Sequence, residues 1–166
     1  MLEIRQERFA DIQAIQQIHL QSFPTPAEAN LVDALRTANH LLVSLIAIVD
    51  GKVVGHVAFS PVSAVTGKLG FGLGPVAVLP AHRKKGLAAT LINTGIAECK
   101  NLGFGWGVVL GNPAYYSRFG FRPASQFGLT DEYEGGDSFQ AVELTPGYLP
   151  RGVGLVKYAE EFGLFE

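Results

Sequence analysis

The stretch VAVLPAHRKKGLA, residues 76–88, joins a run of apolar β-formers to a helical pattern through a turn that carries three successive cations. Arg83, Lys84 and Lys85 stand directly before Gly86, where the helical pattern begins. Cations lower stability at the N-terminus of a helix, which is already the positive pole of its dipole, unless an anion binds there. The free backbone N–H groups of that terminus are themselves a phosphate site. The stretch therefore predicts a strand, an anion-binding turn and a helix; a solvated basic turn is the alternative.

Two better-known phosphate motifs do not describe this turn. The string G-x-x-x-x-G-K-[ST] is absent from the chain. The glycines of GFGLGPV, residues 70–76, precede a strand, whereas a dinucleotide motif follows one. We interpret them as a bend or bulge entering the strand. In the turn itself, Gly86 allows close backbone approach to an anion, Ala88 keeps the first helical turn narrow, and the cations supply charge.

Composition limits the class of protein. Of the 166 residues, 48% are hydrophobic and only 17% are charged, so we expect one well-packed domain over residues 1–166. The net charge of −2 offers no field that recruits nucleic acid or an anionic membrane. The single cysteine, Cys99, suits a reducing compartment. Residues 1–13 are charged where an export signal is apolar, and the apolar run 41–49 is too short to span a bilayer, so we expect a cytoplasmic protein.

The remaining pattern predicts the order of elements. Phe9 to Phe23 carries apolar residues at helical spacing, and a second helix opens at Pro26 with Leu31, Val32 and Leu35 buried. Asp50-Gly51 separates two β-rich runs, which predicts a hairpin with a two-residue turn. The later elements are a loop at 61–70, a strand leading to residue 80, a helix at 86–101, a strand at 105–111, a short helix at 113–119 and strands at 139–144 and 154–159. This order predicts an α/β fold with a mixed central sheet, parallel in the middle and antiparallel at its flanks, with helices on both faces.

Two motifs resemble those of a known superfamily. The pattern V-x-V-x-P-x-x-R-x-x-G-x-A, residues 76–88, resembles the acyl-CoA signature of the GNAT superfamily of N-acetyltransferases. GNPAYYSRFGF, residues 111–121, resembles that family's later Y-x-x-x-G-F element, with Tyr116 four residues before Gly120. The layout of the whole chain, including residues 22–36 and the tail 161–165, looks most like the YhbS-like bacterial subgroup. The resemblance implies a single GNAT-like domain.

The resemblance also implies an activity and a co-substrate. Family members transfer an acetyl group from acetyl-CoA directly to an amine in a ternary complex. By analogy, the turn binds the CoA pyrophosphate, the strand binds the pantetheine arm through its backbone, and an N–H near Ala77 stabilises the oxyanion. Tyr116 is the candidate acid for the departing thiolate, and Asn112 caps its helix and contacts CoA. The cofactor-binding residues implied are Val76, Ala77, Val78, Arg83, Lys84, Lys85, Gly86, Leu87, Ala88 and Asn112.

The general base is less clearly marked, because GLGPVAV lacks the glutamate that many members carry on this strand. Glu28 in the second helix is the first candidate for binding or deprotonating the amine. The acidic loop residues Asp131, Glu132, Glu134 and Asp137 are alternatives for holding a cationic substrate. We interpret His56 as a sheet histidine, Cys99 as a core residue and Tyr115 as a packing or cofactor contact. The histidines show no metal-ligand spacing, so no metal is expected.

Three functions therefore remain open from the sequence. The first is an acetyl-CoA-dependent N-acetyltransferase, monomeric or homodimeric, that acts on a small-molecule or peptide amine, without nucleic acid or membrane partners. The second is a non-catalytic acyl-CoA-binding or regulatory module on the same fold. The third is a plain phospholigand-binding domain, which would show no preference for the pantetheine arm.

Overall fold

The strand and helix that flank the basic turn lie at the centre of the fold. In the computed structural model, which describes residues 1–152 and 154–165, strand β4 spans Gly70–Val78 and helix α3 spans Leu87–Asn101. Gly86 precedes α3 with a φ of +78°, in the left-handed region that favours glycine. The predicted order of strand, turn and helix is thus confirmed.

A mixed sheet runs through the described residues in the order β1-β2-β3-β4-β5-β8-β6. Its strands are β1 (Leu2–Gln6), β2 (Val43–Val49), β3 (Lys52–Val62), β4, β5 (Trp106–Leu110), β8 (Phe139–Glu143) and β6 (Arg122–Pro123). The central pair β4–β5 is parallel, whereas the pairs on either side are antiparallel. This confirms the predicted mixed sheet.

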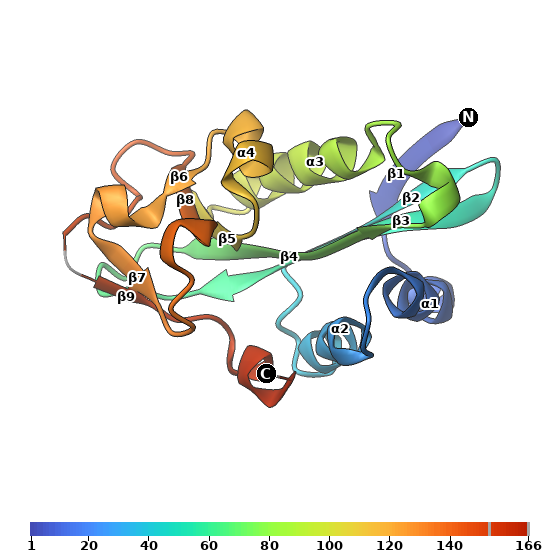
Figure 1. Ribbon diagram of the computed structural model, residues 1–166, viewed down its shortest axis with the longest axis horizontal. Coiled ribbons are helices and arrows are strands. Elements are labelled where there is room, and N and C mark those ends of the chain that lie inside the picture. The colour runs from blue at the N-terminus through green and yellow to red at the C-terminus, as the bar shows by residue number, and fades with distance from the viewer. Residues whose placement is uncertain (153, 166) are drawn as a thin grey trace.

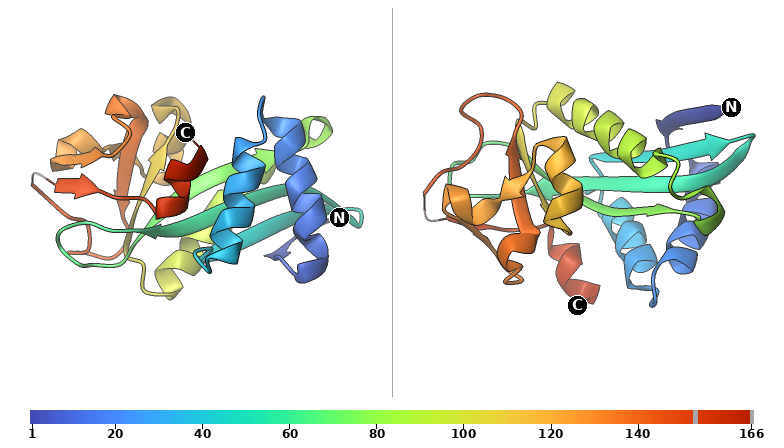
Figure 2. Two further views of the ribbon diagram at one scale, coloured as in Figure 1. Left: turned by 90° about the horizontal axis from the view of Figure 1, so that it is seen from below. Right: turned by 45° about the horizontal axis from the view of Figure 1, so that its top comes forward.

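Helices cover both faces of the sheet, as predicted (Figure 1). Helices α1 (Ile12–Ser22) and α2 (Ala27–Thr37) lie on one face, and α3 and the short α4 (Pro113–Tyr116) lie on the other (Figures 1 and 2). Ile15 and Val32 pack against Ile46 and Ala58 on the first face. On the second face, Gly95 leaves room for the Phe59 ring to pack directly against α3.

The hairpin and the bulge both form, the second at a different place from the one predicted. Asp50 and Gly51 have φ values of +50° and +81°, as a two-residue hairpin turn with right-handed strand twist requires. The β3–β4 register shifts where Val57 pairs with Val76 and Phe59 with Leu73. The additional residue therefore lies in the Gly74-Pro75 segment, in the middle of β4 and not at its entry.

Three expectations about the elements need correction, and one strand was not predicted. The sequence pattern predicts no element at residues 2–6, which form the edge strand β1 paired with β2. Phe9 lies in a short 3₁₀ turn and is 91% exposed, so it is no part of the buried helix face. Pro26 immediately precedes α2 and is not inside its first turn. The strand predicted at 154–159 shortens to β9 (Gly154–Val156), which pairs with β7 (Leu129–Asp131) outside the central sheet.

Candidate active site

The two parallel strands at the centre of the sheet separate partway along their length. Their pairing begins at Gly70 with Trp106 and ends at Leu73 with Val109, immediately before the bulge of β4. Beyond the bulge, Val76 to Val78 still pair with β3 on one side. No strand among the described residues pairs with the other edge of this segment. Leu79 N donates to the Val54 carbonyl of β3, so by alternation along the strand Ala77 also turns its backbone groups toward β3, and Val76 and Val78 face the other edge. The backbone groups of Val76 and the N–H of Val78 can therefore bind an extended ligand there.

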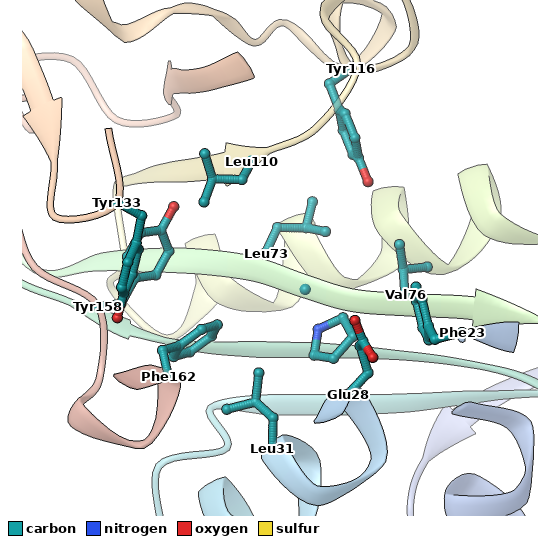
Figure 3. A pocket seen from close by; sticks show the side chains of 12 residues that line it. Phe23, Glu28, Leu31, Leu73, Val76, Leu110, Tyr116, Tyr133, Tyr158 and Phe162 are labelled. Atoms are coloured by element: carbon teal, nitrogen blue, oxygen red, sulfur yellow. The ribbon is translucent and has the colours of Figure 1, made fainter. Parts of the chain in front are cut away.

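A cavity of about 500 Å³ lies at the separation of the strands (Figure 3). Its walls come from α1, α2, β4, β5, α4, the β7 region and the C-terminal segment. The lining residues are Phe23, Glu28, Leu31, Leu73, Gly74, Pro75, Val76, Leu110, Tyr116, Tyr133, Tyr158 and Phe162. This volume lies within the range of about 300–1,000 Å³ that is typical of small-molecule sites.

The structure brings the two candidate catalytic side chains, Tyr116 and Glu28, to this one cavity. Tyr116 extends its hydroxyl into the cavity from α4, and Glu28 extends its carboxylate from the first turn of α2 on the opposite side (Figure 3). Burial, with a smaller contribution from Tyr115, raises the pKa of Tyr116 to about 12, so its hydroxyl is protonated at neutral pH. Glu28 Oε1 is buried and has no hydrogen-bond partner among the described residues. Both groups are thus available to a molecule in the cavity.

A second cavity, of about 370 Å³, lies at the basic turn. It is lined by Val78, His82, Arg83, Lys84, Gly86, Leu87, Ala88, Ala89, Tyr115 and Arg118. A Cβ added to Gly86 would meet no atom within 4 Å, so the space above this backbone is open to a ligand. Lys85 is exposed on the same turn but does not line the cavity. Arg83 Nε donates to the Val78 carbonyl at 2.8 Å, which fixes that side chain beside the end of β4.

Arg118 is a residue of this cavity that the sequence reasoning did not single out. Its Nε donates to the Tyr115 carbonyl at 3.0 Å, and its guanidinium lies 4.3 Å from the centre of the Tyr115 ring. The signal available in the sequence was the three-residue spacing of Tyr115 and Arg118 in a short helix. Asn112 caps that helix, accepting from Ala114 N at 2.9 Å as predicted, but it lines neither cavity.

The four acidic residues of the loop line neither cavity. Asp131 accepts a hydrogen bond from Gly135 N, and Glu132 accepts one from Tyr158 N. Glu134 and Asp137 are exposed. None of the four lines the large cavity, so in this structure the side chain that offers a carboxylate there is Glu28.

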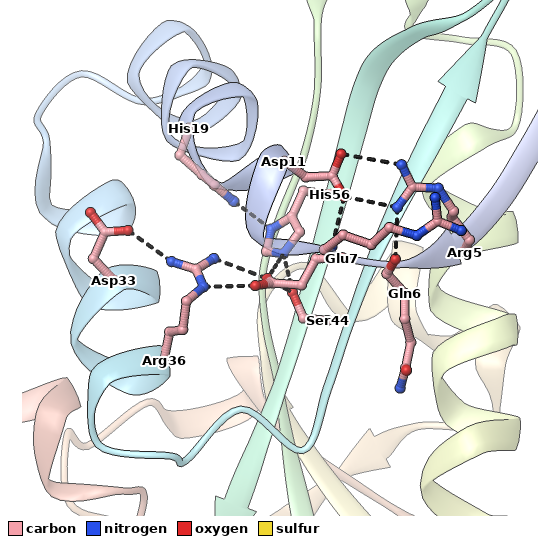
Figure 4. Close-up of polar contacts among 10 residues, drawn as sticks. Arg5, Gln6, Glu7, Asp11, His19, Asp33, Arg36, Ser44 and His56 are labelled. Carbon is pink, nitrogen blue, oxygen red and sulfur yellow. Dashed lines mark hydrogen bonds and ion pairs between the residues drawn. The ribbon is translucent and has the colours of Figure 1, made fainter.

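No histidine or cysteine lines the large cavity. His19 and His56 are buried in a polar cluster with Ser44, Glu7 and Arg36 (Figure 4). His56 is thus a hydrogen-bonded sheet histidine, as interpreted from the sequence. The described residues contain no group of three or more side chains that could hold a metal ion. No helix in the described part of the chain has both the length and the apolar character to cross a membrane.

Cys99 is fully buried in the core, as the sequence indicated. Burial, with a smaller contribution from Glu98, raises the pKa of its thiol to about 12. The thiol is therefore neither accessible nor ionised at neutral pH. It is unsuited to act as a nucleophile.

This fold and these cavities define a class of protein. The family model of the acetyltransferase (GNAT) family matches residues 12–121, and the chain belongs to that family as an enzyme of the N-acetyltransferase class. It is 39% identical over 165 residues, 98% of this chain and 99% of the relative, to the uncharacterized N-acetyltransferase YhbS of Escherichia coli K12. The predicted likeness to the YhbS subgroup is thus confirmed.

Solved structures agree with this assignment. A crystal structure of YhbS from Escherichia coli in complex with CoA has a TM-score of 0.89 and 38% identity, covering 99% of this chain and 93% of that chain. A GNAT family acetyltransferase from Brucella melitensis in complex with acetyl-CoA has a TM-score of 0.81 and 37% identity, with 98% of each chain covered. The predicted fold class is therefore confirmed.

Proposed function

We propose that the protein transfers the acetyl group of acetyl-CoA directly to a primary amine in a ternary complex. The observation that carries the proposal is the position of Tyr116 and Glu28 on opposite walls of one cavity, at the point where β4 and β5 separate. The CoA and acetyl-CoA complexes of the two relatives support the choice of co-substrate.

The residues of this chain fit CoA along a continuous path. The basic turn and Arg118 would hold the pyrophosphate, because cations and the free N–H groups of the α3 N-terminus meet at the open space above Gly86. The backbone groups of Val76 and the N–H of Val78, on the edge of β4 away from β3, would hydrogen-bond the pantetheine arm, since this segment connects the turn cavity to the large cavity. The thioester would then lie in the large cavity beside Val76.

The reaction then needs a proton acceptor for the amine and a donor for the thiolate. The amine nitrogen attacks the thioester carbonyl carbon, forming the C–N bond, and collapse of the tetrahedral intermediate breaks the C–S bond. Glu28 would accept the proton that the amine loses, directly or through a water molecule. A backbone N–H near Ala77 would stabilise the oxyanion, a kind of contact worth about 3 kcal/mol in other enzymes.

Tyr116 acts on the leaving group as a hydrogen-bond donor. Its pKa of about 12 exceeds the ordinary thiol pKa of about 8.5, so complete proton transfer to the thiolate would cost about 5 kcal/mol. A protonated hydroxyl in a buried cavity still stabilises the negative charge that develops on sulfur. The raised pKa thus keeps Tyr116 in its donating form across the working pH range.

Thiol release from acetyl-CoA with a broad panel of amines tests the activity. Tyr116→Phe is expected to lower kcat by about tenfold to a hundredfold, and Glu28→Gln to lower kcat/KM by at least as much. Tyr148→Phe and Glu134→Gln are the matched controls, because neither residue lines the large cavity or the turn cavity. Acetyl-CoA binding with no amine-dependent thiol release would favour the non-catalytic module instead.

The pattern of initial rates with both substrates varied tests direct transfer. The single cysteine is buried, which supports a mechanism without a cysteine acyl-enzyme. Initial rates at varied acetyl-CoA and amine should therefore give intersecting double-reciprocal lines. Parallel lines, or acetylated protein recovered after incubation without amine, would contradict a ternary complex.

A further inference from the structure

The shape and polarity of the large cavity narrow the class of acceptor. We propose that the acceptor is a small amine with one positive charge, carried on an aromatic body by a short linker: an arylalkylamine. This proposal rests on the proposed acetyltransfer and adds the substrate class to it. The argument comes from where the cavity places its charge and its aromatic rings.

The charge in the cavity is confined to one end. Among the twelve lining residues, Glu28 is the only side chain that is ordinarily ionised at neutral pH. The other lining side chains are apolar, apart from the tyrosine hydroxyls. One ammonium group can pair with Glu28, whereas a second ammonium further along would be desolvated among apolar side chains, because no other carboxylate lines the cavity. This arrangement disfavours polyamines and amino sugars with several amino groups.

The other end of the cavity is an aromatic wall formed by Tyr133, Tyr158 and Phe162. The Tyr133 and Tyr158 ring centres are 5.8 Å apart, and those of Tyr158 and Phe162 are 5.1 Å apart. Figure 3 shows this aromatic wall away from Glu28 and Tyr116, with Leu73 between the two ends. An acceptor with its amine at Glu28 therefore places its body against aromatic rings, which favour another aromatic ring by edge and offset contacts.

Residues outside the cavity lining hold the aromatic wall in place. Glu132 accepts a hydrogen bond from Tyr158 N at 2.9 Å. His40 Nδ1 hydrogen-bonds the carboxylate of Glu161, the residue before Phe162 in the C-terminal 3₁₀ segment η6 (Glu160–Phe165). Glu161 is only 5% exposed, so this contact fastens η6 against the loop after α2. The wall is thus preorganised, which reduces the entropy lost on binding.

Rates with matched amines test the proposal. Phenethylamine and tryptamine are compared with n-propylamine, putrescine, spermidine, glucosamine and a lysine-containing peptide, all with acetyl-CoA. We expect kcat/KM for the arylalkylamines to exceed the other values at least tenfold, because apolar contacts discriminate by about 10- to 200-fold. Preference for a polyamine, an amino sugar or the peptide would overturn the acceptor class while leaving acetyltransfer intact. Absence of thiol release with every amine would instead contradict the proposed function.

Variants of the aromatic wall make the test specific. Phe162→Ala should lower kcat/KM for phenethylamine about tenfold or more and leave that for n-propylamine nearly unchanged, whereas Phe162→Leu should recover part of the loss. Leu164→Ala is the matched control, because Leu164 lies on the same segment and is 69% exposed. Equal losses for both amines, or an equal effect of Leu164→Ala, would contradict a role for the aromatic wall in binding the acceptor.

A gain-of-function variant tests the acceptor class independently if the Phe162 variants fold poorly. Leu110 lines the cavity and is 40% exposed, so Leu110→Glu introduces a second carboxylate at little cost to the core. The variant should raise kcat/KM for putrescine relative to phenethylamine about tenfold. An apolar cavity could also hold a long acyl chain, and rates with octanoyl-CoA above those with acetyl-CoA would show that the wall serves the donor, which overturns the proposal.

Discussion

His19 Nε2 and His56 Nδ1 are joined by a hydrogen bond of 2.8 Å between two side chains with no solvent exposure (Figure 4). Ser44 directs its one hydroxyl proton to Glu7, so it accepts from His56 Nε2 at 2.8 Å. His56 Nδ1 therefore accepts from His19 Nε2, and His19 Nδ1 is left without a proton or a partner among the described residues. The pair is neutral and directed toward Glu7, which Arg36 also binds.

This neutral pair should make folding stability depend on pH. Burial, with a smaller effect of Arg36, lowers the pKa of His19 to about 4, and burial lowers that of His56 well below 6.5. Because the unfolded chain binds more protons below pH 6.5, stability is lost as the pH falls from about 6.5 toward 4. His19 alone should cost about 2 kcal/mol between pH 7 and pH 5, measured by urea unfolding. His56 adds a loss in the same direction.

Replacement of one ring separates this effect from general acid sensitivity. His19→Gln should be less stable at pH 7 but should lose less stability than the natural chain between pH 7 and pH 5. A His19→Gln slope equal to that of the natural chain would assign the pH dependence to other groups.

Replacement of Gly95 on α3 by alanine should destabilise the protein. Alanine normally stabilises a helix interior by about 1 kcal/mol relative to glycine. Here the added Cβ would lie 2.0 Å from Phe59 Cε1, and the Phe59 ring is fully buried. Overpacking of this kind costs about 1–3 kcal/mol, so Gly95→Ala should lower the free energy of unfolding despite its helix propensity.

A double-mutant cycle with Phe59 tests the cause. Phe59→Leu alone should destabilise the core. In its background, however, Gly95→Ala should cost less, because the atoms that clash are removed. Additive losses in urea unfolding would mean that the contact between Gly95 and the Phe59 ring does not limit the substitution.

The basic turn and the elements that flank it could be predicted from the sequence because they are contiguous. A strand, a turn with Arg83 and Lys84, and a helix beginning after Gly86 lie within one short stretch, and local signals describe such a unit well. The Asp50-Gly51 hairpin could be predicted for the same reason, because its signal is local. Tyr116 came from the resemblance, whereas Glu28 was the candidate in the second helix where the family's strand glutamate is missing; the structure places both at one cavity.

The aromatic end of the large cavity could not be predicted because tertiary packing assembles it. Tyr133, Tyr158 and Phe162 lie far from Glu28 in the chain, and no local pattern marks them as neighbours. The edge strand β1 has only five residues and a mostly exposed pattern, so its alternation is weak. The sequence predicts a strand at β9. Its pairing with β7, outside the main sheet, depends on the long connections around it and has no local signal.

Arg118 should contribute to binding acetyl-CoA and not to chemistry. Its guanidinium lines the turn cavity, where a charge-assisted hydrogen bond to phosphate is worth about 1.5–3 kcal/mol. Arg118→Gln should therefore raise KM for acetyl-CoA about tenfold or more with kcat nearly unchanged. Arg122→Gln, an exposed arginine on β6, is the control. Equal KM values for the two variants would exclude Arg118 from the site.

Gly86→Val should block the cofactor, and a second glycine separates this effect from backbone strain. Gly86 and Gly67 have φ values of +78° and +73°, and an added Cβ at either meets no atom within 4 Å. Both substitutions to valine should therefore cost similar stability through strain, about 1–2 kcal/mol. Only the valine side chain at position 86 would occupy the open space above the basic turn. We expect calorimetry to show acetyl-CoA affinity reduced at least tenfold for Gly86→Val and unchanged for Gly67→Val; equal affinities would place the pyrophosphate elsewhere.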